Sequence, residues 1–182
     1  SQGMPMIMKN VKIACLDMAL NKFRLRMGVQ VLIDNPEELE KIRQKELDIT
    51  KQRCKMLLAA GANVIICTKG IDEFALKYFV EGKAIAVRRV EKSDLRRIAR
   101  ATGGKVVQTL ANNDGTESFD SSNLGSAECV YEENLGDVDY IFVKNPKGTS
   151  NNTCSLILRG ANEFMLDEID RSIHDALCVL KR

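Results

Sequence analysis

Residues 63–107 read NVIICTKGIDEFALKYFVEGKAIAVRRVEKSDLRRIARATGGKVV. Short apolar runs at 63–68, 84–87 and 105–110 alternate in this stretch with helical patterns at 72–82 and 93–103. Continuous apolar strands between short helices are typical of βαβ units, in which helices cover both faces of a parallel sheet. The sequence therefore predicts an α/β fold built on a parallel sheet.

The segment before this alternation predicts two strands and a long helix. Strands are indicated at 11–16 and 28–33, with an irregular connection between them, and a helix is indicated at 36–60 by a proline in its first turn and a glycine after its end. Apolar residues are sparse at 36–53 and nearly continuous afterwards, so we expect this first half to project and the second to be buried. An ordinary amphipathic surface helix fits the same pattern and stays open.

The segment after the alternation of strands and helices differs in composition and pattern. Residues 111–125 are polar and rich in turn residues, which predicts a loop. Three β-like segments follow, at 127–135, 138–145 and 154–160, and the turns between them favour an antiparallel sheet packed beside the parallel part. The last residues, 161–181, predict a helix with one apolar face.

Composition predicts one soluble globular domain, with room for an appendage. The chain has 182 residues, of which 45% are hydrophobic and 29% charged, and no apolar run approaches the length that spans a bilayer. Nothing near the start indicates a signal peptide, so we expect an intracellular protein. The six cysteines lack any CxxC pair, and several lie in apolar runs, which predicts reduced core residues.

The single histidine, His174, precedes an acid, Asp175, within RSIHDALCVLKR at 171–182. Consecutive side chains on a helix point about 100° apart, which excludes a local catalytic dyad. No GxSxG motif and no recognised zinc-ligand spacing accompany them, so we expect no metal and interpret His174 as a surface or interdomain residue. A small self-contained hydrolase using both residues is one alternative function.

A basic run at 88–100 is the strongest local charge feature. Ser93 is placed to cap a helix whose inward face carries Leu95 and Ala99, so the arginines of this run face outward. Such a face binds phosphates, acidic protein surfaces or only water. Nucleic-acid binding is a second alternative, weakened by the net charge of +2 and by the lack of interleaved aromatic residues. The chain contains neither GxxxxGK[ST] nor GxGxxG, so it has no phosphate cradle of its own.

Several motifs recur in an order that is specific when taken together: KNVKIACLD (9–17), GANV (61–64), KGID (69–72), AVRRV (86–90), DLRRIARATG (94–103), ILRGAN (157–162) and HDALCVLKR (174–182). In this order they resemble the middle of a group II chaperonin subunit of the eukaryotic cytosolic kind. The resemblance covers essentially the whole chain and is weakest at 112–125 and 147–153.

The resemblance implies a chaperonin apical domain at 1–159 with a helical protrusion at about 25–53, followed at 160–182 by one returning helix of the intermediate domain. It implies that Gly3 and Gly160 are hinge positions. It also implies that Asp175 activates the water that attacks the γ-phosphate of ATP. ATP and Mg²⁺ would bind to a domain that this chain does not include, so we expect no cofactor, no metal and no ATPase activity in the chain by itself.

The resemblance further implies a surface that captures unfolded clients such as actin and tubulin. Its residues lie on the helix 93–102, just before that helix and on the connection 16–24. They comprise Met18, Leu20, Phe23, Lys92, Arg96, Arg97 and Arg100. The partners it implies are unfolded proteins and seven paralogous subunits in a hetero-oligomeric double ring in the cytoplasm. No nucleic acid and no membrane are expected as partners.

Overall fold

The computed structural model describes residues 4–21, 36–112, 114–136, 138–148 and 153–181, and it leaves out the side chains of 36–39 and 43. The strand predicted at 28–33, the client contact Phe23 and the hinge position Gly3 lie outside the described residues, as does the part of the predicted protrusion before residue 36. The chain divides into two compact units, Ser1–Asn151 and Asn152–Arg182.

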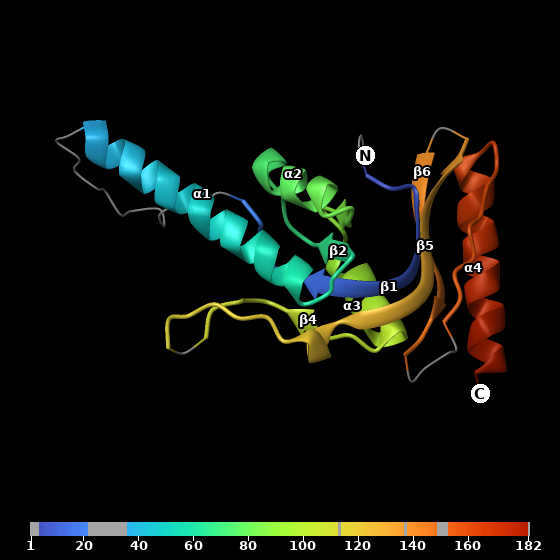
Figure 1. The fold of residues 1–182 in the computed structure, drawn as a ribbon. Coiled ribbons are helices and arrows are strands. Elements are labelled where there is room, and N and C mark those ends of the chain that lie inside the picture. The colour runs from blue at the N-terminus through green and yellow to red at the C-terminus, as the bar shows by residue number, and fades with distance from the viewer. Residues whose placement is uncertain (1–3, 22–35, 113, 137, 149–152, 182) are drawn as a thin grey trace. The chain divides into compact units, whose positions relative to one another are not determined.

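The elements follow in this order: β1 (Ile7–Leu16), α1 (Pro36–Ala59), β2 (Val64–Cys67), α2 (Glu73–Glu81), β3 (Ile85–Val87), α3 (Lys92–Thr102), β4 (Val106–Val107), the 3-10 turn η1 (Ser121–Asn123), β5 (Gly125–Leu135), β6 (Val138–Pro146) and α4 (Glu163–Leu180) (Figure 1). The predicted α/β fold is confirmed, and the helices predicted after residue 60 begin and end within two residues of their expected positions.

One sheet with the strand order β3-β2-β1-β5-β6 forms the centre of the first unit, and β4 pairs with β1 beside it. The β1–β2, β2–β3 and β1–β4 pairs are parallel, as the βαβ pattern predicts. β4 has only two residues, shorter than the predicted strand at 105–110. Its ladder ends where the backbone N–H of Asp17 donates to the carbonyl oxygen of Val107 at 2.8 Å.

Helices cover both faces of the parallel strands, which is why the run VIIC of β2 is buried throughout. One core contains Leu57 of α1 and Phe79 of α2 packed on one face. The other contains Leu95 and Ala99 of α3 packed on the opposite face. Alternate residues of β1 and β2 enter the two cores, as the period of two in a strand requires.

The helix predicted at 36–60 is α1, Pro36–Ala59. In its second half, Cys54 and Leu57 are fully buried, as expected from the dense apolar sequence there. Figure 1 shows the first half of α1 extending beyond the sheet. The projecting helix predicted from the sparse apolar sequence is therefore present in this unit.

The antiparallel strands bend sharply at one point. Asn10 of β1 and Asn145 of β6 have φ angles of 51° and 47°, in the left-handed region that asparagine tolerates better than most residues. They flank Glu128 of β5, and the Nδ2 group of Asn145 donates to its carboxylate. Figure 1 shows the curved course of β5. Because of the bend, Ala127 and Val130 enter the same core although they are three residues apart.

The predictions of a strand at 154–160 and of buried cysteines need correction. Residues 154–160 form no strand among the described residues 153–160, because their alternating sequence has no ladder partner there. Cys154 and Cys178 are exposed, whereas Cys15, Cys54 and Cys67 are buried, so only part of the expected set of core cysteines is found. All six thiols are free.

An ion pair links the C-terminal half of α1 to the loop before η1. Arg53 Nε donates to both carboxylate oxygens of Glu117 at 2.9 Å, and the two side chains are only 17% and 23% exposed. We expect Arg53→Met to lower the free energy of unfolding by about 2 kcal/mol, because it leaves a mostly buried carboxylate without its donor. Chemical denaturation measures this. Lys55→Met, which removes the same charge from an exposed position of α1, is the control, and an equal loss in both variants would contradict a specific pair.

Candidate functional site

α3 presents a basic face because its apolar residues have the spacing of one helical stripe. Leu95 and Ala99 are buried against the sheet, and the arginines that follow each of them in sequence, Arg96, Arg97 and Arg100, are exposed as predicted. The helix ends at Gly103, whose φ of 76° gives the left-handed cap that glycine favours and whose N–H donates to the Ala99 carbonyl oxygen.

The start of α3 differs from the prediction. The helix begins at Lys92 with Glu91 in the capping position, and no side chain caps it. Ser93 lies inside the first turn, where its Oγ bonds to the carboxylate of Glu91 at 3.2 Å. The predicted Ser93 cap is therefore wrong, because the turn starts one residue earlier and brings Lys92 into the helix.

Close packing fixes the other end of α3. Thr102 is 2% exposed, and its hydroxyl donates to the Ile98 carbonyl oxygen at 2.8 Å. A Cβ atom placed on Gly125 of β5 would lie 2.1 Å from that hydroxyl, so only glycine fits there. A Cβ atom placed on Gly148 would lie 2.3 Å from the Ala101 carbonyl oxygen of α3. The N–H of Gly148 donates to that same oxygen at 3.0 Å. The helix that carries the basic face is therefore closely packed at its C-terminal end.

Asp17 joins the connection after β1 to the start of α3. Thr68 Oγ1 donates to Asp17 Oδ1 at 2.6 Å, and Lys92 Nζ lies 3.2 Å from Asp17 Oδ2. The Thr68 hydrogen bond and then the Lys92 ammonium hold the pKa of Asp17 below its ordinary value, against the opposing effect of burial. Sequence reasoning missed Asp17 and Thr68, although both directly follow parallel strands, and the ends of neighbouring parallel strands meet at one edge of a sheet.

Two further contacts hold the connection after β1 in place. The Cys67 thiol donates to the Met18 carbonyl oxygen, and the backbone of Leu20 pairs with the chain near Ile71 in a short parallel bridge. Leu20 is 0% exposed, so its side chain belongs to the core and offers no surface to a client, which corrects that prediction. Met18 is half-buried and keeps some exposed surface, and Phe23 lies outside the described residues.

Replacing Asp17 tests its role as the junction. Because its pKa is lower in the folded protein, the ionised carboxylate stabilises the fold above the unfolded-state value of 3.8, and that stabilisation is lost as the pH falls through the lower folded value. We expect Asp17→Asn to destabilise the protein at neutral pH and the difference from wild type to vanish in acid. Urea denaturation from about pH 7 to about pH 2.5 measures this. A difference that persists unchanged at the acid end would show that the charge of Asp17 is not the cause.

The second unit consists of α4 and the segment before it. Asn162 caps the helix by accepting from the Phe164 N–H at 2.9 Å. The Nδ1 atom of His174 lies 3.8 Å from the nearest oxygen of Asp175, which is beyond hydrogen-bond distance, and both side chains are about three-quarters exposed. The two residues therefore form no catalytic dyad, in agreement with their consecutive spacing.

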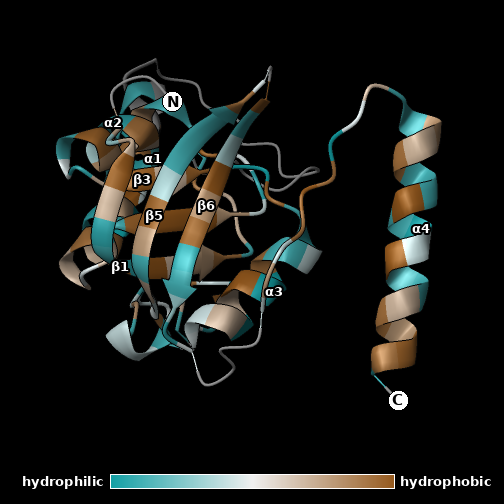
Figure 2. Cartoon of the chain, turned by 90° about the vertical axis from the view of Figure 1, so that its right-hand side faces the viewer, coloured by the Kyte–Doolittle hydropathy of each residue, from teal (hydrophilic) through white to brown (hydrophobic). Residues whose placement is uncertain are grey.

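Gly160 leads into α4, and a Cβ atom there would meet the Leu166 side chain at 3.2 Å. Apolar side chains of the helix, among them Phe164, Leu177 and Leu180, are more than half exposed. Figure 2 shows apolar bands recurring along the helix. Nothing described within this unit covers them.

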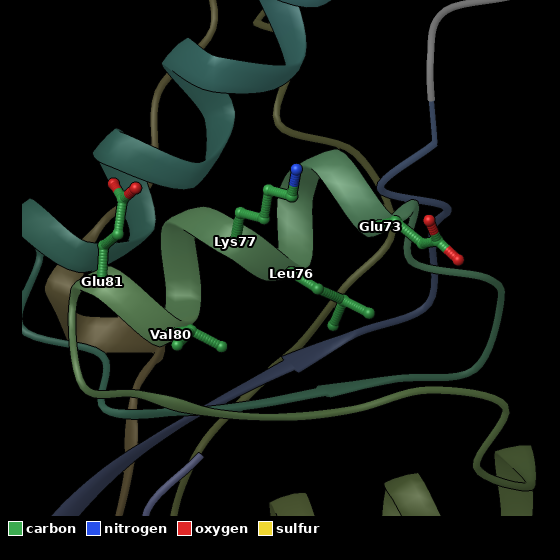
Figure 3. Close-up of a pocket in the computed structure, with 5 residues that line it drawn as sticks. All are labelled: Glu73, Leu76, Lys77, Val80 and Glu81. Carbon is green, nitrogen blue, oxygen red and sulfur yellow. The ribbon is translucent and has the colours of Figure 1, made fainter. Parts of the chain in front are cut away.

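The rest of the described chain offers no competing site. Among the described residues, no group of three or more metal-ligating side chains lies close enough together to hold a metal ion. A shallow hollow of about 370 Å³ lies along α2, lined by Glu73, Leu76, Lys77, Val80 and Glu81 (Figure 3). All of its lining residues come from one helix, so no second element supplies a converging group. No helix in the described part of the chain is long and apolar enough to cross a membrane.

Comparison with known proteins agrees with the fold and with the order of motifs. The chain is 57% identical over its whole length to T-complex protein 1 subunit alpha of Arabidopsis thaliana and 50% identical to that of Dictyostelium discoideum. Thermosome subunit beta of Saccharolobus shibatae is 38% identical over 96% of the chain. The chain spans 30–33% of the length of these relatives.

A solved structure, described as the open state monomer of a group II chaperonin from Methanococcoides burtonii, matches 98% of this chain with a TM-score of 0.72 at 26% identity. The match covers 36% of that structure. It confirms the expected chaperonin fold. The family model for the TCP-1/cpn60 chaperonin family matches residues 1–182. Since the family model, the relatives, the fold and the motifs agree, the chain belongs to the TCP-1/cpn60 chaperonin family.

Proposed function

We propose that this chain is the client-binding apical domain of a cytoplasmic, ATP-dependent chaperonin subunit, joined to one helix of the intermediate domain. Membership of the chaperonin family supports this role, as does the match to a third of each relative's length. The observation that carries the proposal is the closely packed helix α3, whose exposed basic face lies beside the connection after β1.

Capture of an unfolded polypeptide requires both polar and apolar contacts. The arginines of α3 supply charge-assisted hydrogen bonds to client carboxylates and carbonyls, and Met18 supplies exposed apolar surface. Phe23, beyond the described part of this connection, is proposed to extend the apolar contact. The protrusion at about 25–53, which includes the projecting half of α1, is proposed to form the subunit's part of a built-in lid.

Asp175 is proposed to act only in the full-length subunit. There it would orient the water that attacks the γ-phosphate of ATP, while other domains hold the phosphates and Mg²⁺. Its exposed position on α4 suits a group that meets its substrate across a domain boundary. Gly3 and Gly160 are proposed as the hinge through which the apical domain moves. The full subunit is expected to assemble with paralogous subunits into a double ring.

Hydrogen exchange tests the proposal. We expect a saturating unfolded client, such as chemically denatured actin, to slow exchange at residues 16–24 and at α3, since those amides become covered on binding. The control is the same titration with folded actin, which should protect neither segment. Protection centred on His174 and Asp175, or none at either expected segment, would contradict the client-binding role.

A further inference from the structure

The basic residues of the proposed client surface are not equivalent. Residues 88–100 carry six basic and two acidic side chains, a net charge of +4 against +2 for the whole chain. The basic residues of α3 itself are Lys92, Arg96, Arg97 and Arg100, and all of them are exposed. The positions of the neighbouring acids divide them into two pairs.

Lys92 and Arg97 already have carboxylates beside them. Lys92 Nζ lies 3.2 Å from Asp17, which is held in place by its hydrogen bond from Thr68. Arg97 Nη1 lies 3.8 Å from Asp94, one turn earlier on the same helix. A client carboxylate that approaches either cation also approaches the resident carboxylate, so the gain in attraction is largely offset by repulsion.

Arg96 and Arg100 have no such neighbour. In the part of the chain that the structure describes, neither side chain takes part in an ion pair. They are four residues apart on one helix, so their Cβ atoms lie about 5–6 Å apart and their guanidinium groups reach the same stretch of solvent. The buried side chains of Leu95 and Ala99 fix the orientation of this part of the helix.

We propose that Arg96 and Arg100 are the specificity-determining residues of this surface, and that they select unfolded clients through an extended acidic segment of the pattern acid-x-acid. In an extended chain, alternate side chains point to the same side and are about 6.5–7 Å apart. Two carboxylates at that spacing match two guanidinium groups one helical turn apart, and each carboxylate accepts charge-assisted hydrogen bonds from one guanidinium group. This inference rests on the proposed client-binding function.

The surface fits an acidic polypeptide better than a nucleic acid. α3 contains no aromatic residue on which a base would stack. The positive charge is also limited to α3 and the two exposed arginines just before it, Arg88 and Arg89, whereas binding along a phosphate backbone favours an extended basic track. The half-buried Ile98 and Met18 provide apolar surface for the neighbouring side chains of a client instead.

Fluorescence anisotropy with labelled unstructured peptides tests the inference. The probe peptide repeats Glu-x-Glu, its control repeats Gln-x-Gln, and single-stranded DNA serves as a third ligand. Arg96→Gln and Arg100→Gln are compared with Arg97→Gln, which removes the same charge from the same helix. We expect each of the first two variants to weaken binding of the Glu-x-Glu peptide about threefold to fivefold and Arg97→Gln to weaken it less than about twofold.

The outcomes separate the inference from the function on which it rests. Equal weakening by all three variants would overturn the selective pair, because only the summed charge would then matter. Equal or tighter binding of the Gln-x-Gln peptide would overturn acid selection but leave client binding intact. Tighter binding of DNA at the same arginines would overturn the polypeptide ligand. Failure of the Glu-x-Glu peptide, the Gln-x-Gln peptide and denatured actin alike to bind would overturn the proposed function itself.

Discussion

Gly125→Ala is expected to lower the free energy of unfolding of the first unit by about 3 kcal/mol, which corresponds to a fall in Tm of roughly 6–12 °C. The new Cβ atom would lie 2.1 Å from Thr102 Oγ1 and 2.7 Å from Thr102 Cβ. Thr102 has no free space to move into, because it is buried and its hydroxyl is hydrogen-bonded within α3. Differential scanning calorimetry measures the change.

Gly70→Ala is the matched control for this substitution. There the nearest atoms belong to the side chain of Asn21, at 3.2 Å, and that side chain is exposed and free to rotate away. We expect a change of less than about 0.5 kcal/mol. Adding Thr102→Ala to Gly125→Ala should recover part of the loss, since it removes the closest contact. Similar losses at Gly125 and Gly70 would mean that the seating of α3 on β5 does not limit stability.

Asp175→Asn in the full-length, assembled subunit is expected to slow ATP hydrolysis at that subunit by about 10²-fold or more while leaving ATP affinity nearly unchanged. The asparagine has the shape of the aspartate but cannot accept a proton from the attacking water. Single-turnover hydrolysis and equilibrium nucleotide binding measure the two effects separately. This expectation rests on the proposed role of Asp175 in the intermediate domain.

The control for this experiment is Asp170→Asn, which removes a carboxylate from an exposed position of the same helix. It should leave the rate of hydrolysis within about twofold of the wild type. A loss of affinity for ATP that matches the loss of rate in Asp175→Asn would assign the residue to phosphate or metal binding instead. Equal rates of ATP hydrolysis in the two variants would show that Asp175 takes no part in the reaction.

The parallel half of the fold is predictable because its signal is local. The run VIIC of β2 and the helix Pro36–Ala59 each follow from residues adjacent in sequence, and both lie where the pattern places them. The segment 154–160 has the same kind of signal but forms no strand, because a strand also needs a partner that periodicity does not identify. The bend at Asn10 and Asn145 escaped prediction for a related reason, since asparagine more often marks a turn than a left-handed residue inside a ladder.

Only part of the candidate site can be predicted from the sequence. The outward direction of Arg96 and Arg100 follows from the helical period, and the exposed fraction of both side chains agrees with it. The burial of Leu20 did not follow, because an apolar residue in an irregular connection has no period from which to infer its direction. Asp17 was missed because its partner Thr68 is 51 residues away, and only the order of the strands brings them together.

The distribution of thiols gives this chain built-in reporters of its own conformation. Burial raises the pKa of both Cys15 and Cys54 to about 12, so these core thiols should resist alkylation until the first unit opens. Cys154 and Cys178, both in the second unit, are exposed and should be modified at once. Counting the labels by mass spectrometry would therefore distinguish a folded first unit that holds an unfolded client from one that has itself begun to unfold.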